Sequence, residues 1–148
     1  MALHRGEQIL ATLKTLLSSG CSFSNTVDRN RIITYQESDL PALKLSVGPE
    51  QRVADYTGGL QDWVLPVDFS CVVSSTNNDL ETLLFAYRRE LHLKIMADNT
   101  LGLSFVIDST EVSTDSPVLS TPDGTAPIAE QTWRWEFEYR RSVNDPSA

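Results

Sequence analysis

Two cysteines, two histidines and a scatter of carboxylates are the side chains of this sequence that could carry chemistry. Cys21 and Cys71 lack the paired spacing of a zinc site and are too few for a disulfide framework. Cys71 lies in the apolar run DFSCVV without a basic neighbour, which is typical of a buried thiol that packs as a small hydrophobe. The cysteines therefore predict neither a metal site nor a nucleophile.

The histidines and carboxylates do not form a recognisable catalytic pattern either. The TGGLQD segment has adjacent glycines but lacks the spacing and the following Lys-Ser/Thr of a P-loop, and the sequence has no HExxH, GxSxG or CxxC motif. His4 lies near the N-terminus and His92 within a charged helical segment, which favours surface or interface histidines over a general base. Asp55, Asp68 and Asp108 could meet only through contacts that the sequence does not specify. We therefore expect no catalytic residue, no cofactor and no metal.

Size and charge restrict the remaining classes. A chain of 148 residues with 41% hydrophobic and 22% charged residues is expected to form a single domain over residues 1–148. Its net charge of −8 gives it no overall attraction for nucleic acid, because phosphate binding requires clustered Lys and Arg. The sequence has no signal peptide and no apolar run long enough to span a bilayer, so we expect a soluble protein made in a reducing cytoplasm, with no membrane partner.

The first half of the chain alternates between periodic and polar segments. Apolar residues at three- and four-residue spacing predict an amphipathic helix over 3–19, which Gly20 is well placed to end. The polar segment 50–62 is expected to be a long connection with a flexible glycine tip. Pro66, which has no amide proton, indicates an edge or a bulge in the longest strand. Alternating apolar residues predict strands over 31–35, 41–47 and 63–73.

The second half predicts a helix, a strand, a loop and a closing strand. The helix begins near a capping box formed by Asn78 and Glu81, stops around Met96-Ala97, and is followed at once by a strand from Leu101. Three prolines and few large apolar groups predict a mobile loop over 113–128. The helix stripe and the closing strand's aromatic face are expected to be core: Leu80, Leu83, Leu84, Tyr87, Leu91, Ile95, Trp133, Trp135, Phe137 and Tyr139.

Strands in runs, rather than in strict alternation with helices, are typical of an α+β protein. We therefore expect a mainly antiparallel sheet with two helices packed on one face, in the order α-β-β-β-α-β-β.

With this order in place, nearly the whole chain resembles the tail terminator (minor tail, tail completion) proteins of long-tailed bacteriophages. The likeness rests on the helix RGEQILATLKTLL, the strand PALKLSV, the segment NNDLETLLFAYRRELHLKIMADNTLGL, the long loop and the aromatic strand ending near Tyr139. The junction from the second helix through ADNTLGL into a strand is its most characteristic part. Head-to-tail joining proteins share much of this pattern.

The resemblance implies a structural virion protein that forms a homo-hexameric ring, caps the tail tube, stops its elongation and presents a surface for head-to-tail joining. Its partners would be its own copies, the tail tube protein and the head-completion or connector protein, with DNA passing through the ring without specific binding. It would lie at the head-proximal end of the tail, after assembly in the host cytoplasm. Arg88, Arg89, Glu136 and Glu138 are the candidate subunit interface, and Pro117, Pro122, Asp123 and Gly124 the candidate tail-tube contact loop.

Two other interpretations stay open at this stage. One is a small-molecule-binding or enzymatic α+β domain with a pocket under the 113–128 loop. The other is a monomeric cytosolic adaptor domain without affinity for tail tubes. A closed pocket with converging polar groups would favour the first.

Overall fold

The structure, a computed structural model, describes residues 2–23, 26–122 and 124–148. Two α-helices and seven β-strands form within these residues, and a 3-10 turn covers Glu37–Asp39. Their order along the chain is one helix, four strands, a second helix and three strands. The elements are α1 (Arg5–Leu17), β1 (Val27–Arg29), β2 (Ala42–Val47), β3 (Gln51–Tyr56), β4 (Leu60–Ser74), α2 (Leu80–Met96), β5 (Val106–Thr114), β6 (Val118–Ser120) and β7 (Ile128–Ser142).

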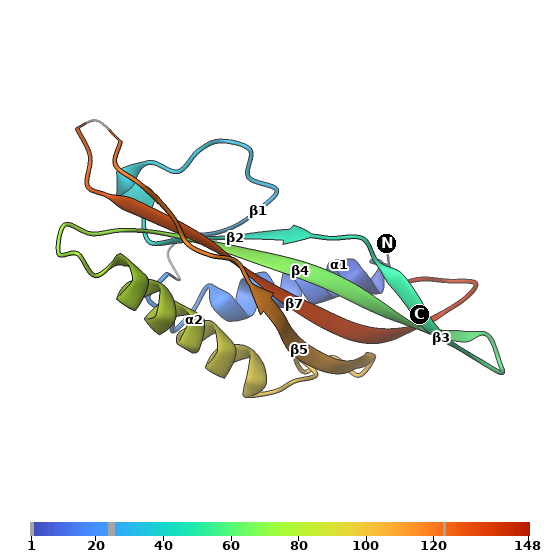
Figure 1. Cartoon of the computed structure of the whole chain (residues 1–148). Helices are drawn as coiled ribbons and strands as arrows, with labels where there is room; N and C mark the ends of the chain where they lie inside the picture. Colours follow the sequence, from blue (N-terminus) through green and yellow to red (C-terminus); the bar gives the residue numbers. More distant parts are fainter. Residues whose placement is uncertain (1, 24–25, 123) are drawn as a thin grey trace.

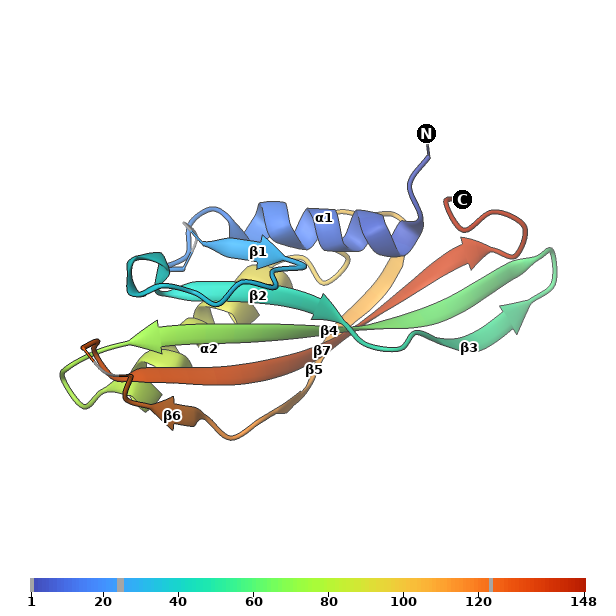
Figure 2. The ribbon, with the colours of Figure 1, turned by 90° about the horizontal axis from the view of Figure 1, so that it is seen from above.

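The seven strands form one mixed sheet. Its strand order is β1-β2-β4-β7-β5. In addition, β3 pairs with the first residues of β4, and β6 pairs with the first residues of β7. β1 and β2 are parallel, and the other described pairs are antiparallel. The centre of the sheet is the pairing of β4 with β7, which runs from Leu60 opposite Ser142 to Ser74 opposite Ile128. Figures 1 and 2 show these two long strands twisting together along the molecule.

One face of this sheet holds the core. Alternate residues of β4 and β7 point to that face, and the apolar stripes of α1 and α2 pack against them. The expected core residues of α2 and β7 all belong to this core or pack against it. Both helices therefore cover the same face, with α1 contacting β1 and α2 crossing β4, β5 and β7 (Figure 2). The expected α+β class, the mainly antiparallel sheet and the placement of the helices are confirmed. We call the opposite side of the sheet the outer face. No helix of the described chain is long and apolar enough to cross a membrane.

Several local expectations for the first half are wrong. Residues 31–35 are not a strand, and the short strand β1 lies before them at Val27–Arg29. The polar segment 50–62 contains β3, which pairs with β4 as a hairpin through left-handed Gly58 and Gly59. No apolar alternation marks β3 in the sequence, because five of its six residues are exposed.

Pro66 lies in a central strand but at a local edge, because β4 has no paired neighbour on one side of it between β2 and β3. The strand next to it changes here, because β2 ends opposite Val67 and β3 begins opposite Val64. The carbonyl of Pro66 accepts a hydrogen bond from the amide of Gly48 at 2.9 Å, so its missing amide proton would have pointed into the same gap between β2 and β3. The interruption is what allows a proline in a central strand.

In the second half, the capping and the junction differ from expectation. The N-cap of α2 is Asp79, not Asn78, which has a positive φ of 56° just before the helix. The helix ends at Met96 as expected, but the strand does not begin at once. Leu101 and Gly102 both adopt positive φ in consecutive turns, and β5 starts only at Val106. The phase of the strand differs as well, since Val106 is buried and the residue after it is 39% exposed.

A charged cluster ties the β3–β4 hairpin to β7. The Asp62 carboxylate is 2% exposed and accepts hydrogen bonds from Arg140 Nε at 2.8 Å, Arg140 Nη2 at 3.1 Å and the Tyr56 hydroxyl at 2.8 Å. The Arg140 guanidinium also lies 4.6 Å from the centroid of the Tyr56 ring. The hydrogen bonds from Arg140 lower the pKa of Asp62 below its ordinary value, against the opposing effect of burial.

This shift predicts an acid-dependent contribution to stability. A carboxyl group with a lowered folded-state pKa stabilises the fold above its unfolded pKa and loses that contribution as pH falls through the folded value. We expect Asp62→Asn to lower the melting temperature at neutral pH and the difference from wild type to shrink as pH falls below about 4. Melts followed by circular dichroism across this range measure it. Asp55→Asn, on the same hairpin at a 59% exposed side chain, is the matched control. A constant difference for Asp62→Asn at every pH would contradict the assignment.

Candidate functional site

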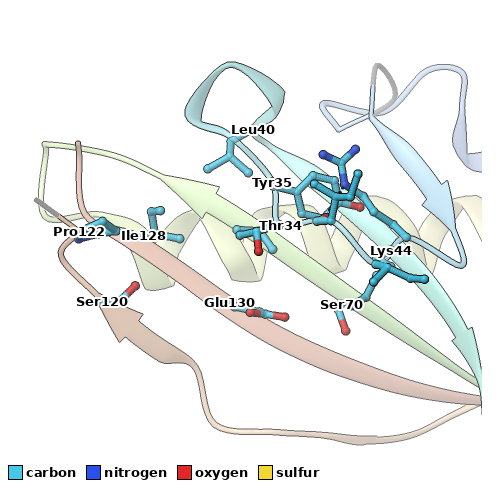
Figure 3. Close-up of a pocket in the computed structure, with 13 residues that line it drawn as sticks. Thr34, Tyr35, Leu40, Lys44, Ser70, Ser120, Pro122, Ile128 and Glu130 are labelled. Carbon is cyan, nitrogen blue, oxygen red and sulfur yellow. Dashed lines mark hydrogen bonds between the residues drawn. The ribbon is translucent and has the colours of Figure 1, made fainter. Parts of the chain in front are cut away.

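A hollow of about 360 Å³ lies on the outer face of the sheet (Figure 3). Its floor comes from three adjacent strands: Lys44 of β2, Ser70 and Val72 of β4, and Glu130 of β7. One wall is the segment 31–40 that precedes β2, and the other comes from the segment 120–128 that joins β6 to β7. Segments far apart in the sequence thus line the same surface.

The first wall is held by Arg31. Its guanidinium forms ion pairs with Asp28 at 3.1 Å and Asp39 at 3.2 Å, and it lies 4.1 Å from the centroid of the Tyr35 ring. Burial, together with the nearby Asp28 charge, raises the pKa of Tyr35 well above its ordinary value. These contacts explain why residues 31–35 form a loop across the sheet instead of a strand. In the same loop, Ile33 is 78% exposed beside the hollow.

The second wall belongs to the segment in which the tail-tube contact was expected. The prolines do not prevent strand pairing altogether, because Val118–Ser120 pair with residues 128–130 of β7. Pro122 is exposed and lines the hollow, Gly124 is exposed with a positive φ of 73°, and Pro117 is half-buried before β6. Asp123 lies outside the described residues.

The charges of the floor are not neutralised within the described chain. Neither Lys44 nor Glu130 forms a side-chain ion pair or hydrogen bond there. Lys44 lies opposite Ser70, and Glu130 lies opposite Val72 two residues further along β4. Two strand spacings and two residues of rise place the two α-carbons about 12 Å apart. The floor of the hollow therefore carries a cation and an anion that form no ion pair within the described residues, with Ser70 and Val72 of β4 between them.

The four proposed interface residues lie on two opposite sides of the molecule. Arg88 and Arg89 lie on α2, which covers the core face, while Glu136 and Glu138 alternate with core aromatics and so point from the outer face. Arg88 binds Glu111 of β5, with its Nε and Nη2 each 2.6 Å from Oε1. Arg89, Glu136 and Glu138 form no ion pair within the described residues.

Arg88 therefore has a structural role within its own subunit. Glu111 also meets His92 Nδ1 at 3.0 Å, so one carboxylate joins two successive turns of α2 to β5. On the outer face, Glu138 lies directly opposite Asp108 of β5 in the strand register. Carboxylates in neighbouring register positions repel each other and favour a cationic partner.

The described contacts of Cys71 and of the two histidines are structural. Cys71 is fully buried, and burial raises its pKa strongly, as expected for an inert core thiol. His4 caps α1 by accepting the Gly6 amide at 3.0 Å and also meets Arg141. His92 is engaged by the carboxylate of β5 described above.

The three aspartates lie apart as well. Asp55 is on the β3 hairpin, Asp68 is 3.7 Å from Arg134 on the outer face, and Asp108 accepts from Asn99 beyond α2. Among the described residues, no group of three or more His, Cys, Asp or Glu side chains could hold a metal ion.

Comparison with known proteins finds likeness at the level of structure. No protein-family model matches the chain, and no curated protein matches it. Among solved structures, the chain is similar to one from a virion of a native gene transfer agent particle. That match covers 88% of this chain and 93% of the other, with a TM-score of 0.49 and 10% sequence identity. The two chains share a loosely similar path, and nothing about function follows from it.

Proposed function

We propose that the chain is a structural virion protein that forms a ring on the head-proximal end of a phage tail tube, stops its elongation and offers its other side to the head connector. The observation that carries the proposal concerns charges that form no ion pair within the described residues. They are distributed over two opposite sides of one subunit. Arg89 lies on the α2 side, and Glu130, Glu136 and Glu138 lie on the outer face. Two different but complementary patches are what a closed ring of identical subunits requires, because each interface is heterologous.

The resemblance of the sequence to tail terminators supplies the stoichiometry and the partners of this proposal. Six subunits, each with a net charge of −8, would surround the channel with negative charge, so that DNA passes without specific binding. The tail tube protein and the connector are the proposed neighbours on the two sides of the ring. The segment containing Pro117, Pro122, Asp123 and Gly124 is the proposed contact with the tube.

The test is the length of tails assembled without the protein. Deleting its gene should yield tails of variable, mostly excessive length and heads that remain unjoined, because nothing stops the addition of tube subunits. Electron microscopy of lysates measures both effects. Restoring the wild-type gene on a plasmid is the control. Tails of normal, uniform length joined to heads in the deletion strain would contradict the proposal.

The hollow favours one second candidate, which is small-molecule binding. It lies beside the 120–128 segment, where the alternative interpretation placed a pocket, and it combines apolar walls with Lys44 and Glu130. Ser70 of the lining is hydrogen-bonded to Thr132 rather than to Lys44 opposite it, so we propose binding rather than catalysis. It differs from the ring proposal in requiring a ligand that binds the isolated subunit.

A further inference from the structure

The solvent-facing side of α2 carries an aromatic residue between two opposite charges. Glu81, Phe85 and Arg89 are spaced four residues apart and so follow one another along the same side of the helix. Phe85 is 67% exposed, and neither charge forms an ion pair within the described residues. A phenyl ring held in water on the polar side of a helix adds nothing to the core of its own subunit, and it is the kind of side chain that anchors protein interfaces.

The hollow on the outer face presents the complementary arrangement. Ser70 and Val72 of β4 lie between Lys44 and Glu130, and Ile33 and Ile128 line the hollow around them. Eight residues of helix separate the two charges of α2 by about 12 Å. This equals the separation of about 12 Å between Lys44 and Glu130 across the sheet. The signs also match, since the anion of the helix can meet the cation of the hollow while the cation meets the anion.

We propose that α2 of one copy docks on the outer face of a second copy, with Phe85 in the hollow, Glu81 paired to Lys44 and Arg89 paired to Glu130. A hollow of about 360 Å³ has room for a phenyl ring. The two contacting surfaces are different patches of the same chain, so the contact is heterologous and repeats from copy to copy until it closes. The inference rests on the proposed function, whose ring it provides with a specific interface.

This contact changes the partner assigned to Arg89. Glu136 and Glu138 were its proposed partners, but they lie further along β7 and do not line the hollow. Arg88 is not a suitable residue for testing this contact, because reversing its charge would break its ion pair with Glu111 inside the subunit. Arg89→Glu and Glu130→Arg each reverse one charge that has no partner in its own described chain.

The heterologous geometry makes mixing of two defective variants informative. Each single reversal puts like charges at every interface, so self-association should weaken roughly tenfold or more in either variant alone. When Arg89→Glu and Glu130→Arg are mixed in equal amounts, an alternating arrangement pairs opposite charges at every contact. Association should then return toward the wild-type level, as it should in the protein carrying both changes. Sedimentation velocity and native mass spectrometry measure the species formed, and melts check that each variant is folded.

Glu138→Arg is the matched control, because it makes the same charge change on the same strand and face. Alone it should associate like wild type, because Arg89 and Glu130 are unchanged, and mixed with Arg89→Glu it should not draw that variant into complete assemblies. Rescue of Arg89→Glu by Glu138→Arg in place of Glu130→Arg would overturn the docking of Phe85 while leaving the proposed ring intact. Wild-type association of Arg89→Glu alone or of Glu130→Arg alone would overturn it as well. A wild-type protein that remains monomeric, both at its highest soluble concentration and on isolated tails, would overturn the contact and the ring together.

Discussion

Replacing Phe69 or Trp135 by alanine should lower the free energy of unfolding by roughly 3–5 kcal/mol, the usual cost of deleting a buried aromatic side chain. Both side chains are buried, at 0% and 1% exposure, in the two central strands. Phe69 lies between Leu45 of β2 and Trp133 of β7 in the strand register. The Trp135 ring is stacked against Phe137, with 6.3 Å between their centroids. Each deletion therefore opens a cavity between the sheet and the helices.

Urea denaturation followed by circular dichroism measures this loss. Phe85→Ala is the matched control, because it removes a phenyl ring from a 67% exposed position and should change the free energy of unfolding by no more than about 0.5 kcal/mol. Trp135→Phe should cost less than Trp135→Ala, since it keeps most of the volume and removes a buried indole N–H that has no partner in the described chain. A Phe69→Ala protein as stable as Phe85→Ala would mean that the core face has been misassigned.

The core could be predicted from the sequence because its pattern is local and complete. Along β4 and β7, alternate residues are buried over most of the length of both strands, and a period of two is what a sheet with one buried face imposes. The stripe of α2 follows the helical period in the same way, with Leu84, Leu91 and Ile95 buried. At each of these positions, the period of the strand or helix that contains the residue is enough to predict that its side chain is buried.

The wrong expectations concern segments whose conformation depends on contacts outside themselves. The RIITY segment has the composition of a strand, but the ion pairs of Arg31 with Asp28 and Asp39 hold it as a loop. β3 has the composition of a loop, but β4 extends beyond β2 and offers it an edge to pair with. At the end of α2, the positive φ of Leu101 delays the strand, and no rule of composition places a leucine there.

The candidate site could not be assembled from the sequence at all. Lys44 and Glu130 are far apart in the chain and become neighbours of one hollow only through the order of β2, β4 and β7. The helix side of the proposed contact did leave a signal. Phe85 is an aromatic residue on the side of α2 away from its predicted apolar stripe, four residues from Glu81 and four from Arg89. An apolar residue on a polar helix face is therefore the sequence feature that predicts an interaction surface on this side of α2.

Shortening the connection between β6 and β7 should leave a folded protein that no longer completes tails. Ser120 and Ile128 are paired in the strand register, so an Asn-Gly turn in place of residues 121–127 can close the hairpin without moving either strand. Asp115, which is paired with Arg134, and the whole of β7 remain unchanged. The melting temperature should therefore stay close to that of wild type, because the described residues within 121–127 contribute no side chain to the core.

The functional loss is expected because this segment is the proposed contact with the tail tube. Val118–Ser120 already pair with β7, but 121–127 has two prolines and no large apolar residue, so the ordering of this part should come from the tube or a neighbouring subunit. A protease should accordingly cut the segment readily in the free protein and slowly on assembled tails. The shortened variant should give tails of variable length or tails that fail to join heads, as seen by electron microscopy and infectious yield. A Gly-Ser linker of unchanged length in place of 121–127 is the control. It keeps the length of the segment and removes its side chains, so it distinguishes an effect of lost side-chain contacts from an effect of a shorter segment. If the shortened protein completes tails of normal length with a normal yield, the segment does not contact the tube, and the ring must dock through another part of its surface.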